Sequence, residues 1–119
     1  MHRLTLAATF LAASTISVLA AEVGGSYTIE GTNFDGSPYG GTASITVASN
    51  STCEIVWSTG ASESAGICML LDDAFAAGYV LQDKVGLIVY KLRDDGVLSG
   101  VWTVAGMDGA GTEVLTPAP

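Results

Sequence analysis

Histidine is nearly missing from this chain of 119 residues, and its one copy, His2, lies at the extreme N-terminus. Everything downstream therefore lacks the residue needed for Ser-His-Asp or Cys-His catalysis, for a histidine zinc site and for a histidine pH switch. A serine nucleophile would still need a base, and only Lys84 or Lys91 could serve. We therefore expect no enzymatic activity, no catalytic residue and no cofactor.

Positive charge is also scarce. Beyond Arg3 the only cations are Lys84, Lys91 and Arg93, whereas the chain has 12 acidic residues. With these three cations against 12 acids, the chain after residue 20 has a net charge of −9. Such a charge favours solubility and disfavours nucleic acid or an anionic membrane surface as a partner.

The acidic residues lack the spacing of a metal site. Asp72-Asp73, Asp94-Asp95 and Asp108 have the oxygen ligands that calcium prefers, but none matches an EF-hand loop or a repeated calcium motif. Acidic residues at hairpin tips are typical of solvated turns. Glu30 and Glu54 are expected to point outward, and no carboxylate pair has the spacing to cleave a glycoside. The sequence predicts no metal site.

Only one long apolar run is present, and it begins the chain. A basic start, 1–3, precedes an apolar stretch over 4–18 that is rich in Ala, Ser and Thr, and Val18-Leu19-Ala20 fits the small-residue rule for cleavage. The stretch is short for a membrane anchor. We predict a cleaved signal peptide over 1–20, with cleavage after Ala21 as the near alternative. The mature protein would then be periplasmic or secreted, with no membrane span.

Cysteine is limited to Cys53 and Cys68, which lack the C-x-x-C spacing of a redox pair. In an exported chain a structural disulfide is the default. If Gly60-Ala61 is a two-residue turn, strand partners have numbers that sum to 121, which places the two cysteines directly opposite each other. Directly opposed strand residues lie within disulfide range.

Strand signals recur every 10 to 13 residues, separated by Gly, Asp, Asn and Ser, and no uninterrupted helical period appears. A short helix is an alternative only near 73–79. The pattern predicts an all-β fold, a single antiparallel up-and-down meander over 21–116 that closes into a small barrel, lipocalin-like or inhibitor-like, followed by a tail at 117–119. The expected strands are 26–32, 39–47, 53–58, 64–70, 74–81, the two arms of a hairpin at 85–102, and 111–116.

The hairpin at 85–102 is the clearest fold signal. Its turn, Asp94-Asp95-Gly96, ends in a glycine that tolerates positive φ. Because strand side chains alternate, the facing pairs share one side of the hairpin, and Gly100 leaves room for the Tyr90 ring. The predicted pairs are Leu92 with Leu98, Tyr90 with Gly100, and Ile88 with Trp102.

Inner and outer faces of the predicted barrel suggest different roles. An eight-stranded barrel has room for side chains or one small ligand. We expect the rings of Tyr27, Trp57, Tyr90 and Trp102 to fill it, which argues against an open ligand cavity.

On the outside of the same hairpin, Leu87, Val89 and Val101 are expected to be exposed, with Ile67 and Met69 extending the apolar surface. Scattered exposed apolar residues are ordinary, whereas a contiguous patch marks weak self-association or an unknown protein partner. Both readings stay open.

A series of short motifs runs through the chain after the leader: Tyr27-x-Ile29-x-Gly31-Thr32-Asn33, Asp35-Gly36-Ser37-x-Tyr39-x-Gly41, Val56-Trp57, Gly66-Ile67-Cys68-Met69, Val89-Tyr90, Asp95-Gly96, Leu98-x-Gly100-x-Trp102 and Gly111-Thr112-Glu113-x-Leu115. With these motifs the sequence resembles a family of small exported proteins of alphaproteobacteria, some of which carry the label "fibronectin-binding protein". The resemblance spans almost the whole chain after the leader and implies a periplasmic or secreted location in a Gram-negative bacterium. It assigns no binding residue.

Two classes of function follow. The first is a non-catalytic module that binds a protein or associates with the envelope; it includes adhesin-type fibronectin binding, implied by the family label, and a periplasmic protease inhibitor, by analogy of architecture. The second is a small-molecule carrier, which requires an interior cavity.

Overall fold

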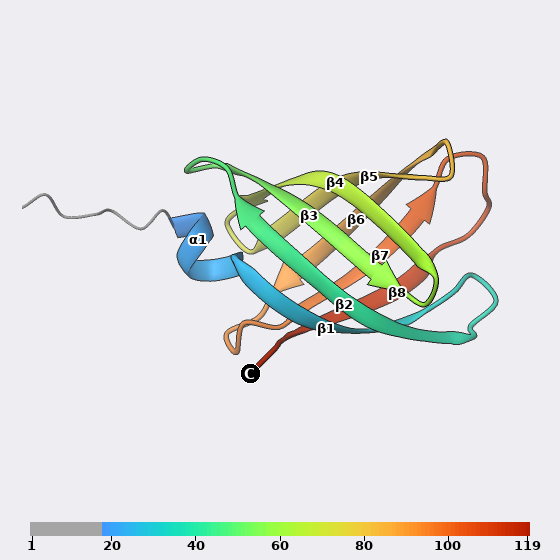
Figure 1. Cartoon of the computed structure of the whole chain (residues 1–119), viewed down its shortest axis with the longest axis horizontal. Coiled ribbons are helices and arrows are strands. Elements are labelled where there is room, and N and C mark those ends of the chain that lie inside the picture. Colours follow the sequence, from blue (N-terminus) through green and yellow to red (C-terminus); the bar gives the residue numbers. More distant parts are fainter. Residues whose placement is uncertain (1–17) are drawn as a thin grey trace, which may run out of the picture.

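A closed barrel of eight antiparallel strands makes up most of the molecule (Figure 1). The structure is a computed structural model that describes residues 18–119, so residues 1–17 of the predicted signal peptide lie outside the described part. Each strand pairs with the next in sequence, and β8 pairs with β1 to close the barrel, which confirms the predicted fold. The strands are β1 (Gly25–Thr32), β2 (Pro38–Val47), β3 (Thr52–Thr59), β4 (Ser62–Leu71), β5 (Ala74–Leu81), β6 (Lys84–Leu92), β7 (Leu98–Val104) and β8 (Gly111–Pro117).

The β6–β7 hairpin has the predicted register. Arg93 N donates to the Val97 carbonyl at 2.9 Å, and Gly96 adopts a φ of 83° in the turn, a conformation that glycine reaches without a Cβ clash. Tyr90 lies opposite Gly100, and Ile88 lies opposite Trp102.

The predicted disulfide between Cys53 and Cys68 is also present. The two residues are directly paired on β3 and β4, with a Cα–Cα distance of 4.9 Å, and both are buried. The bridge therefore fixes the register of a hairpin whose turn is only two residues long.

Aromatic rings lie over glycines on the neighbouring strand at four places around the barrel. At each pair a Cβ in place of the glycine hydrogen would overlap the ring, so the glycine is what allows the ring to cover the next strand. This arrangement holds the rings against the barrel wall. The pairs are Tyr39 over Gly31, Tyr79 over Gly86, Tyr90 over Gly100, and Trp102 over Gly111.

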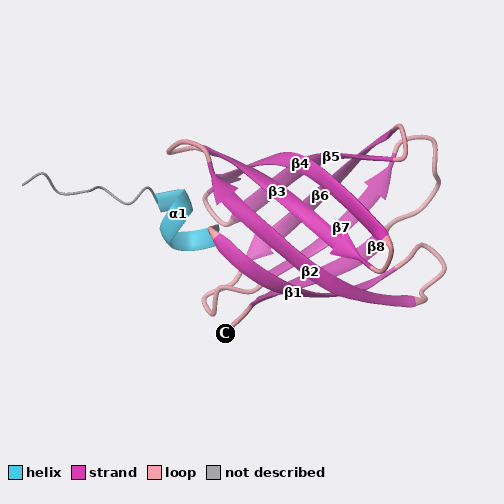
Figure 2. Ribbon diagram, in the orientation of Figure 1, coloured by secondary structure: helices cyan, strands magenta, loops and turns pink. Residues whose placement is uncertain are grey.

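One end of the barrel is covered by a short helix, α1 (Val18–Val23), which Figure 2 shows as the one helix of the described chain. Leu19 and Val23 are buried there, and the Tyr27 hydroxyl donates to the Val23 carbonyl at 2.6 Å. We did not predict this helix, because its residues were assigned to the end of the signal peptide. The predicted cleavage site after Ala20 falls inside α1, so Leu19 stands on the leader side of it.

The side chains nearest this helix-covered half form a continuous apolar core. Aliphatic residues from several strands meet there with the disulfide and with Phe75, whose ring lies 5.8 Å from that of Tyr90. The buried aliphatic members are Ile29, Ile45, Ile55, Leu98 and Leu115. No helix among residues 18–119 is long and apolar enough to cross a membrane.

We predict that Gly66→Ala destabilises the barrel, whereas Gly78→Ala on the adjacent strand does not. A Cβ at Gly66 would overlap the carbonyl oxygen of Gly78, which is backbone and cannot move aside, while a Cβ at Gly78 would have its nearest neighbour at 3.9 Å. Overpacking of this kind costs about 1–3 kcal/mol. Urea unfolding of both variants measures the difference, and equal midpoints would contradict it.

Candidate functional site

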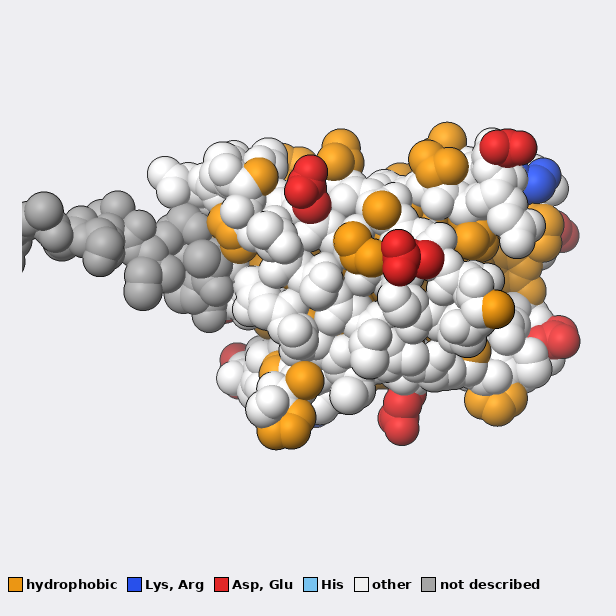
Figure 3. All heavy atoms as spheres, viewed as in Figure 1, with side chains coloured by type: hydrophobic (Ala, Val, Ile, Leu, Met, Phe, Trp, Pro, Cys, Tyr) orange, Lys and Arg blue, Asp and Glu red, His pale blue; other side chains and the backbone are white. Residues whose placement is uncertain are grey.

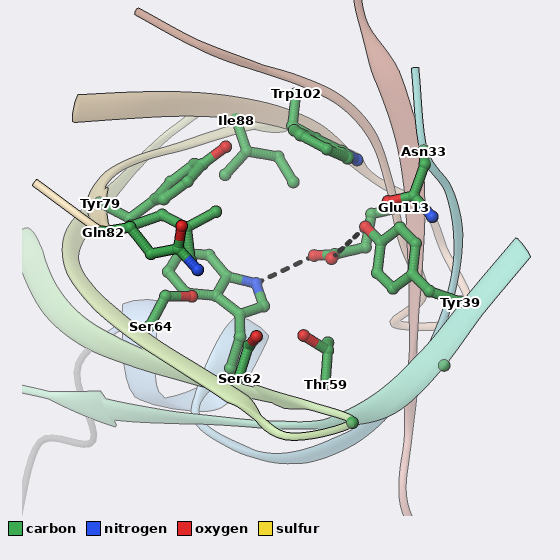
Figure 4. A pocket seen from close by; sticks show the side chains of 14 residues that line it. Asn33, Tyr39, Thr59, Ser62, Ser64, Tyr79, Gln82, Ile88, Trp102 and Glu113 are labelled. Carbon is green, nitrogen blue, oxygen red and sulfur yellow. Dashed lines mark hydrogen bonds between the residues drawn. The ribbon is translucent and has the colours of Figure 1, made fainter. Parts of the chain in front are cut away.

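A cavity of about 530 Å³ occupies the barrel end opposite α1. It lies among the β1–β2 loop, the β3–β4 turn and the β5–β6 turn, and it reaches down to Glu113 (Figure 4). Our prediction that four aromatic side chains fill the interior is wrong for this half. Tyr27 packs at the α1 end, and Trp102 lies over Gly111 against the wall, so neither ring fills the lumen at the end opposite α1.

Glu113 is the one buried charged residue of the described chain, with 4% of its surface exposed. Its Oε2 accepts hydrogen bonds from the Trp57 indole nitrogen, at 2.9 Å, and from the Tyr90 hydroxyl. Its Oε1 accepts one from the Tyr39 hydroxyl at 2.7 Å. Three donors from three different strands therefore converge on one carboxyl group.

Burial raises the pKa of Glu113 above its ordinary value of 4.5, and the three hydrogen bonds oppose this rise without cancelling it. Burial and the nearby carboxylate together raise the pKa of Tyr79 to about 12. The same two causes hold the pKa values of Tyr39 and Tyr90 well above the usual tyrosine range. The three tyrosines therefore keep their protons, and Tyr39 and Tyr90 remain donors to Glu113.

The site can satisfy both protonation states of Glu113. When the carboxylate is charged, it accepts from all three donors. When Oε1 carries a proton, it can donate to the Tyr39 oxygen, because the Tyr39 hydroxyl also lies 3.3 Å from the Thr112 carbonyl and can donate there instead. No buried polar side-chain atom among the described residues is left without a partner.

The walls of the cavity differ in chemistry. One side presents Tyr79, Ile88 and Trp102, and the opposite side presents the hydroxyl groups of Thr59, Ser62 and Ser64 (Figure 4). The polar atoms of the two rings are already bonded to backbone: Tyr79 donates to the Thr103 carbonyl at 2.9 Å and Trp102 to the Thr112 carbonyl at 3.2 Å. The rings therefore offer their apolar surfaces to the cavity.

Alternation along β8 explains how Glu113 enters the lumen. Gly111, Glu113 and Leu115 are buried, whereas Thr112 and Thr116 are exposed. We predicted this strand but assigned no inner face to it, and Glu113 was therefore missed. Leu115 was the available signal, because an inward leucine places the residue two positions earlier on the same side.

The apolar residues singled out on the outside lie far from this chemistry. Leu87, Val89 and Val101 are each more than half exposed on the outer wall, and Ile67 and Met69 are exposed beside them. They lie in rows across neighbouring strands, since Met69 pairs with Ala76, Ala76 with Val89, and Val89 with Val101. In Figure 3 orange side chains gather over the β3–β5 region, whereas the wall formed by β1 and β2 is mostly white.

The acidic residues considered as calcium ligands stay apart in the structure. Asp73 lies 3.9 Å from Lys91, and Asp95 lies 3.2 Å from Arg93, each in or beside an exposed turn. Over residues 18–119 no group of three or more His, Cys, Asp or Glu side chains could hold a metal ion. Neither Lys84 nor Lys91 lines the cavity.

Comparison with known proteins gives structural likeness only. No family model and no curated protein matches this chain. A redesigned β-barrel, b11L5F_LGL, superposes with a TM-score of 0.74 at 16% identity, covering 89% of this chain and 100% of its own. A second redesigned β-barrel, mFAP1 bound to DFHBI, superposes with a TM-score of 0.68 at 20% identity, covering 84% of this chain and 99% of its own. The fluorescent protein UnaG superposes with a TM-score of 0.55 at 12% identity, covering 83% of this chain and 99% of its own. These likenesses support the small-barrel fold.

Glu113→Gln is predicted to flatten the pH dependence of stability. Because folding raises the pKa of Glu113, its contribution is fully present at or below the ordinary value of 4.5 and is lost as the pH rises through the folded-state pKa. The wild-type unfolding free energy should therefore fall by up to about 1.4 kcal/mol per pH unit within that window.

Urea unfolding between pH 4.5 and pH 8 measures this slope. Glu30→Gln, which removes an exposed carboxylate on β1, serves as the matched control and should keep the wild-type slope. An unchanged slope in Glu113→Gln would contradict the assignment. In Glu113→Ala, Tyr39 can still donate to the Thr112 carbonyl and Trp57 to the Tyr90 oxygen, but the buried Tyr90 hydroxyl loses its acceptor. The variant should therefore lose about 1–3 kcal/mol of unfolding free energy at every pH.

Proposed function

We propose that this protein is a non-catalytic carrier that binds one small organic molecule in the cavity at the barrel end opposite α1. The observation that carries the proposal is the cavity itself, which combines apolar rings with a buried polar cluster centred on Glu113. Ligand sites are typically concave, largely apolar and equipped with a few polar groups that fix orientation. Its volume falls in the range of such sites.

The fold supports the same proposal. Eight-stranded barrels are either filled by side chains or hold one small ligand, and the cavity favours the second case here. One of the structurally similar barrels, mFAP1, is described with DFHBI bound. The apolar half near α1 is packed and stabilises the barrel, whereas the open half near Glu113 leaves space for a ligand.

We place the carrier outside the cytoplasm, in the periplasm or secreted. The Cys53–Cys68 disulfide suggests an oxidising compartment, because such bridges persist where thiols are not kept reduced. The apolar leader over 1–20 supports the same location.

We expect an uncharged aromatic probe, Nile red, to bind the folded protein with one-to-one stoichiometry. The two tryptophans of the chain, Trp57 and Trp102, both line the cavity, so binding should quench their fluorescence directly. Ser64→Phe, which fills the cavity from β4, should weaken binding by about tenfold or more. Ser99→Phe, on the exposed side of β7, should not. Equal binding by both variants would place the probe elsewhere and count against the carrier.

A second candidate function rests on the apolar outer wall of β4–β7, which fits a protein partner or a second copy of the chain. Adhesin-type fibronectin binding, implied by the family resemblance, would use the same kind of surface. This surface and the cavity are separate, so the two functions are compatible.

For self-association the predicted readout is mass in solution. Val89 and Val101 are directly paired, so Val89→Lys with Val101→Glu places opposite charges side by side and should keep the hairpin intact. If the outer wall joins two copies, wild-type protein should show a concentration-dependent mass by sedimentation that the double variant loses. A wild-type protein that stays monomeric at all concentrations would rule out self-association through the outer wall.

A further inference from the structure

We infer that the ligand carries a positively charged nitrogen, which binds at Glu113, and an apolar or aromatic body, which packs against the cavity rings. This inference rests on the proposed carrier function and specifies its substrate class as organic amines. It also predicts rejection of anionic ligands such as carboxylic acids.

The first argument is the charge of the cavity. Glu113 is the one charged residue that lines it, and none of the three cations of residues 18–119 does so. The three groups that bond to Glu113 are neutral donors. A buried carboxylate with no cation beside it either takes up a proton or keeps its charge at a desolvation cost that hydrogen bonds offset only in part. The protein supplies no such cation at this site, and a bound ammonium group would.

The second argument is the free acceptor capacity of Glu113. Each carboxylate oxygen can accept about two hydrogen bonds. Oε2 is fully used by Trp57 and Tyr90, whereas Oε1 accepts only from Tyr39. Figure 4 shows the Glu113 carboxyl group pointing into the space among the lining side chains. One acceptor position is therefore open toward the cavity for an N–H donor.

The third argument is the chemistry of the walls. The rings of Trp57, Tyr79 and Trp102 border the cavity, with Trp57 and Tyr79 packed edge to face at 5.2 Å between centroids. Aromatic faces attract ammonium groups and also accept the apolar body of an amine. The hydroxyl groups of Ser62 and Ser64 can accept hydrogen bonds from other polar groups of the ligand.

The arrangement also opposes anions. A ligand carboxylate placed at the open position would meet a like charge, which is unfavourable unless one of the two groups takes up a proton. Every other titratable side chain that faces Glu113 is a tyrosine: Tyr39 from β2, Tyr79 from β5 and Tyr90 from β6. These remain neutral, so no group reverses the sign of the site.

The test uses three probes with one phenylbutyl body: 4-phenylbutylamine, 4-phenylbutanol and 4-phenylbutyrate. Calorimetry on the full mature protein at pH 7.5 should rank the amine first and the acid last, with about tenfold or more between them. Amine affinity should rise with pH through the pKa of Glu113, because only the carboxylate attracts the cation.

Two variants make the test specific. Glu113→Gln keeps the size of the side chain but removes its charge. Its amide oxygen can still accept from Trp57 and Tyr90, and its NH2 group can donate to the Tyr39 oxygen while the Tyr39 hydroxyl donates to the Thr112 carbonyl. The variant should therefore abolish the preference for the amine and leave alcohol binding nearly unchanged. Glu30→Gln removes an exposed carboxylate and should keep the preference. Near-ultraviolet circular dichroism confirms that each variant is folded.

The outcomes separate the two proposals. Equal affinity for all three probes, or a preference for the amine that survives in Glu113→Gln, overturns the amine inference and leaves the carrier standing. If none of the three probes nor Nile red binds, the carrier function fails, and the inference fails with it. An amine preference lost only in Glu113→Gln supports both.

Discussion

A single buried carboxyl group constrains the open half of this barrel. Glu113 could not remain inside without hydrogen-bond donors, because desolvation of a carboxylate costs several kcal/mol even after relaxation. Its donors come from β2, β3 and β6, while Glu113 itself comes from β8. Each of these hydrogen bonds therefore crosses the lumen and joins β8 to a strand that is not its neighbour in the sheet. Glu113 lies at the inner boundary of the cavity, and the protein needs its hydrogen bonds for its own stability.

Much of the fold could be predicted because its registers depend on local signals. The Gly60 turn and the cysteine spacing each gave the β3–β4 pairing, and Gly96 gave the β6–β7 pairing. The cavity was missed for a physical reason. Four rings were expected to fill the interior, whereas Tyr90 and Trp102 lie over glycines on adjacent strands and Tyr27 packs at the α1 end, so the open half keeps free space. Glu113 was missed because no inner face was assigned to its strand, where an acid lies inside and Val114 toward the outside, the reverse of the usual pattern.

The barrel also has two unlike outer walls. The outer positions of β2 are Thr42, Ser44 and Thr46, which suit contact with water, whereas the outer positions of β4–β7 include many exposed aliphatic side chains. A strand needs only one apolar face to join a barrel core. The second apolar face on β4–β7 is therefore not required by the fold, and this is why it stands as a candidate for contact with another protein.

The rings over glycines have a consequence for how such a cavity changes. Gly31, Gly86 and Gly111 do not line the cavity, yet each sets how close a lining ring lies to the wall. An alanine in place of Gly86 or Gly111 would add a methyl group behind Tyr79 or Trp102 and push that ring into the cavity. The width of the cavity is thus set by positions that do not line it. In the proposed carrier, ligand selectivity would therefore change through substitutions that look conservative in the sheet.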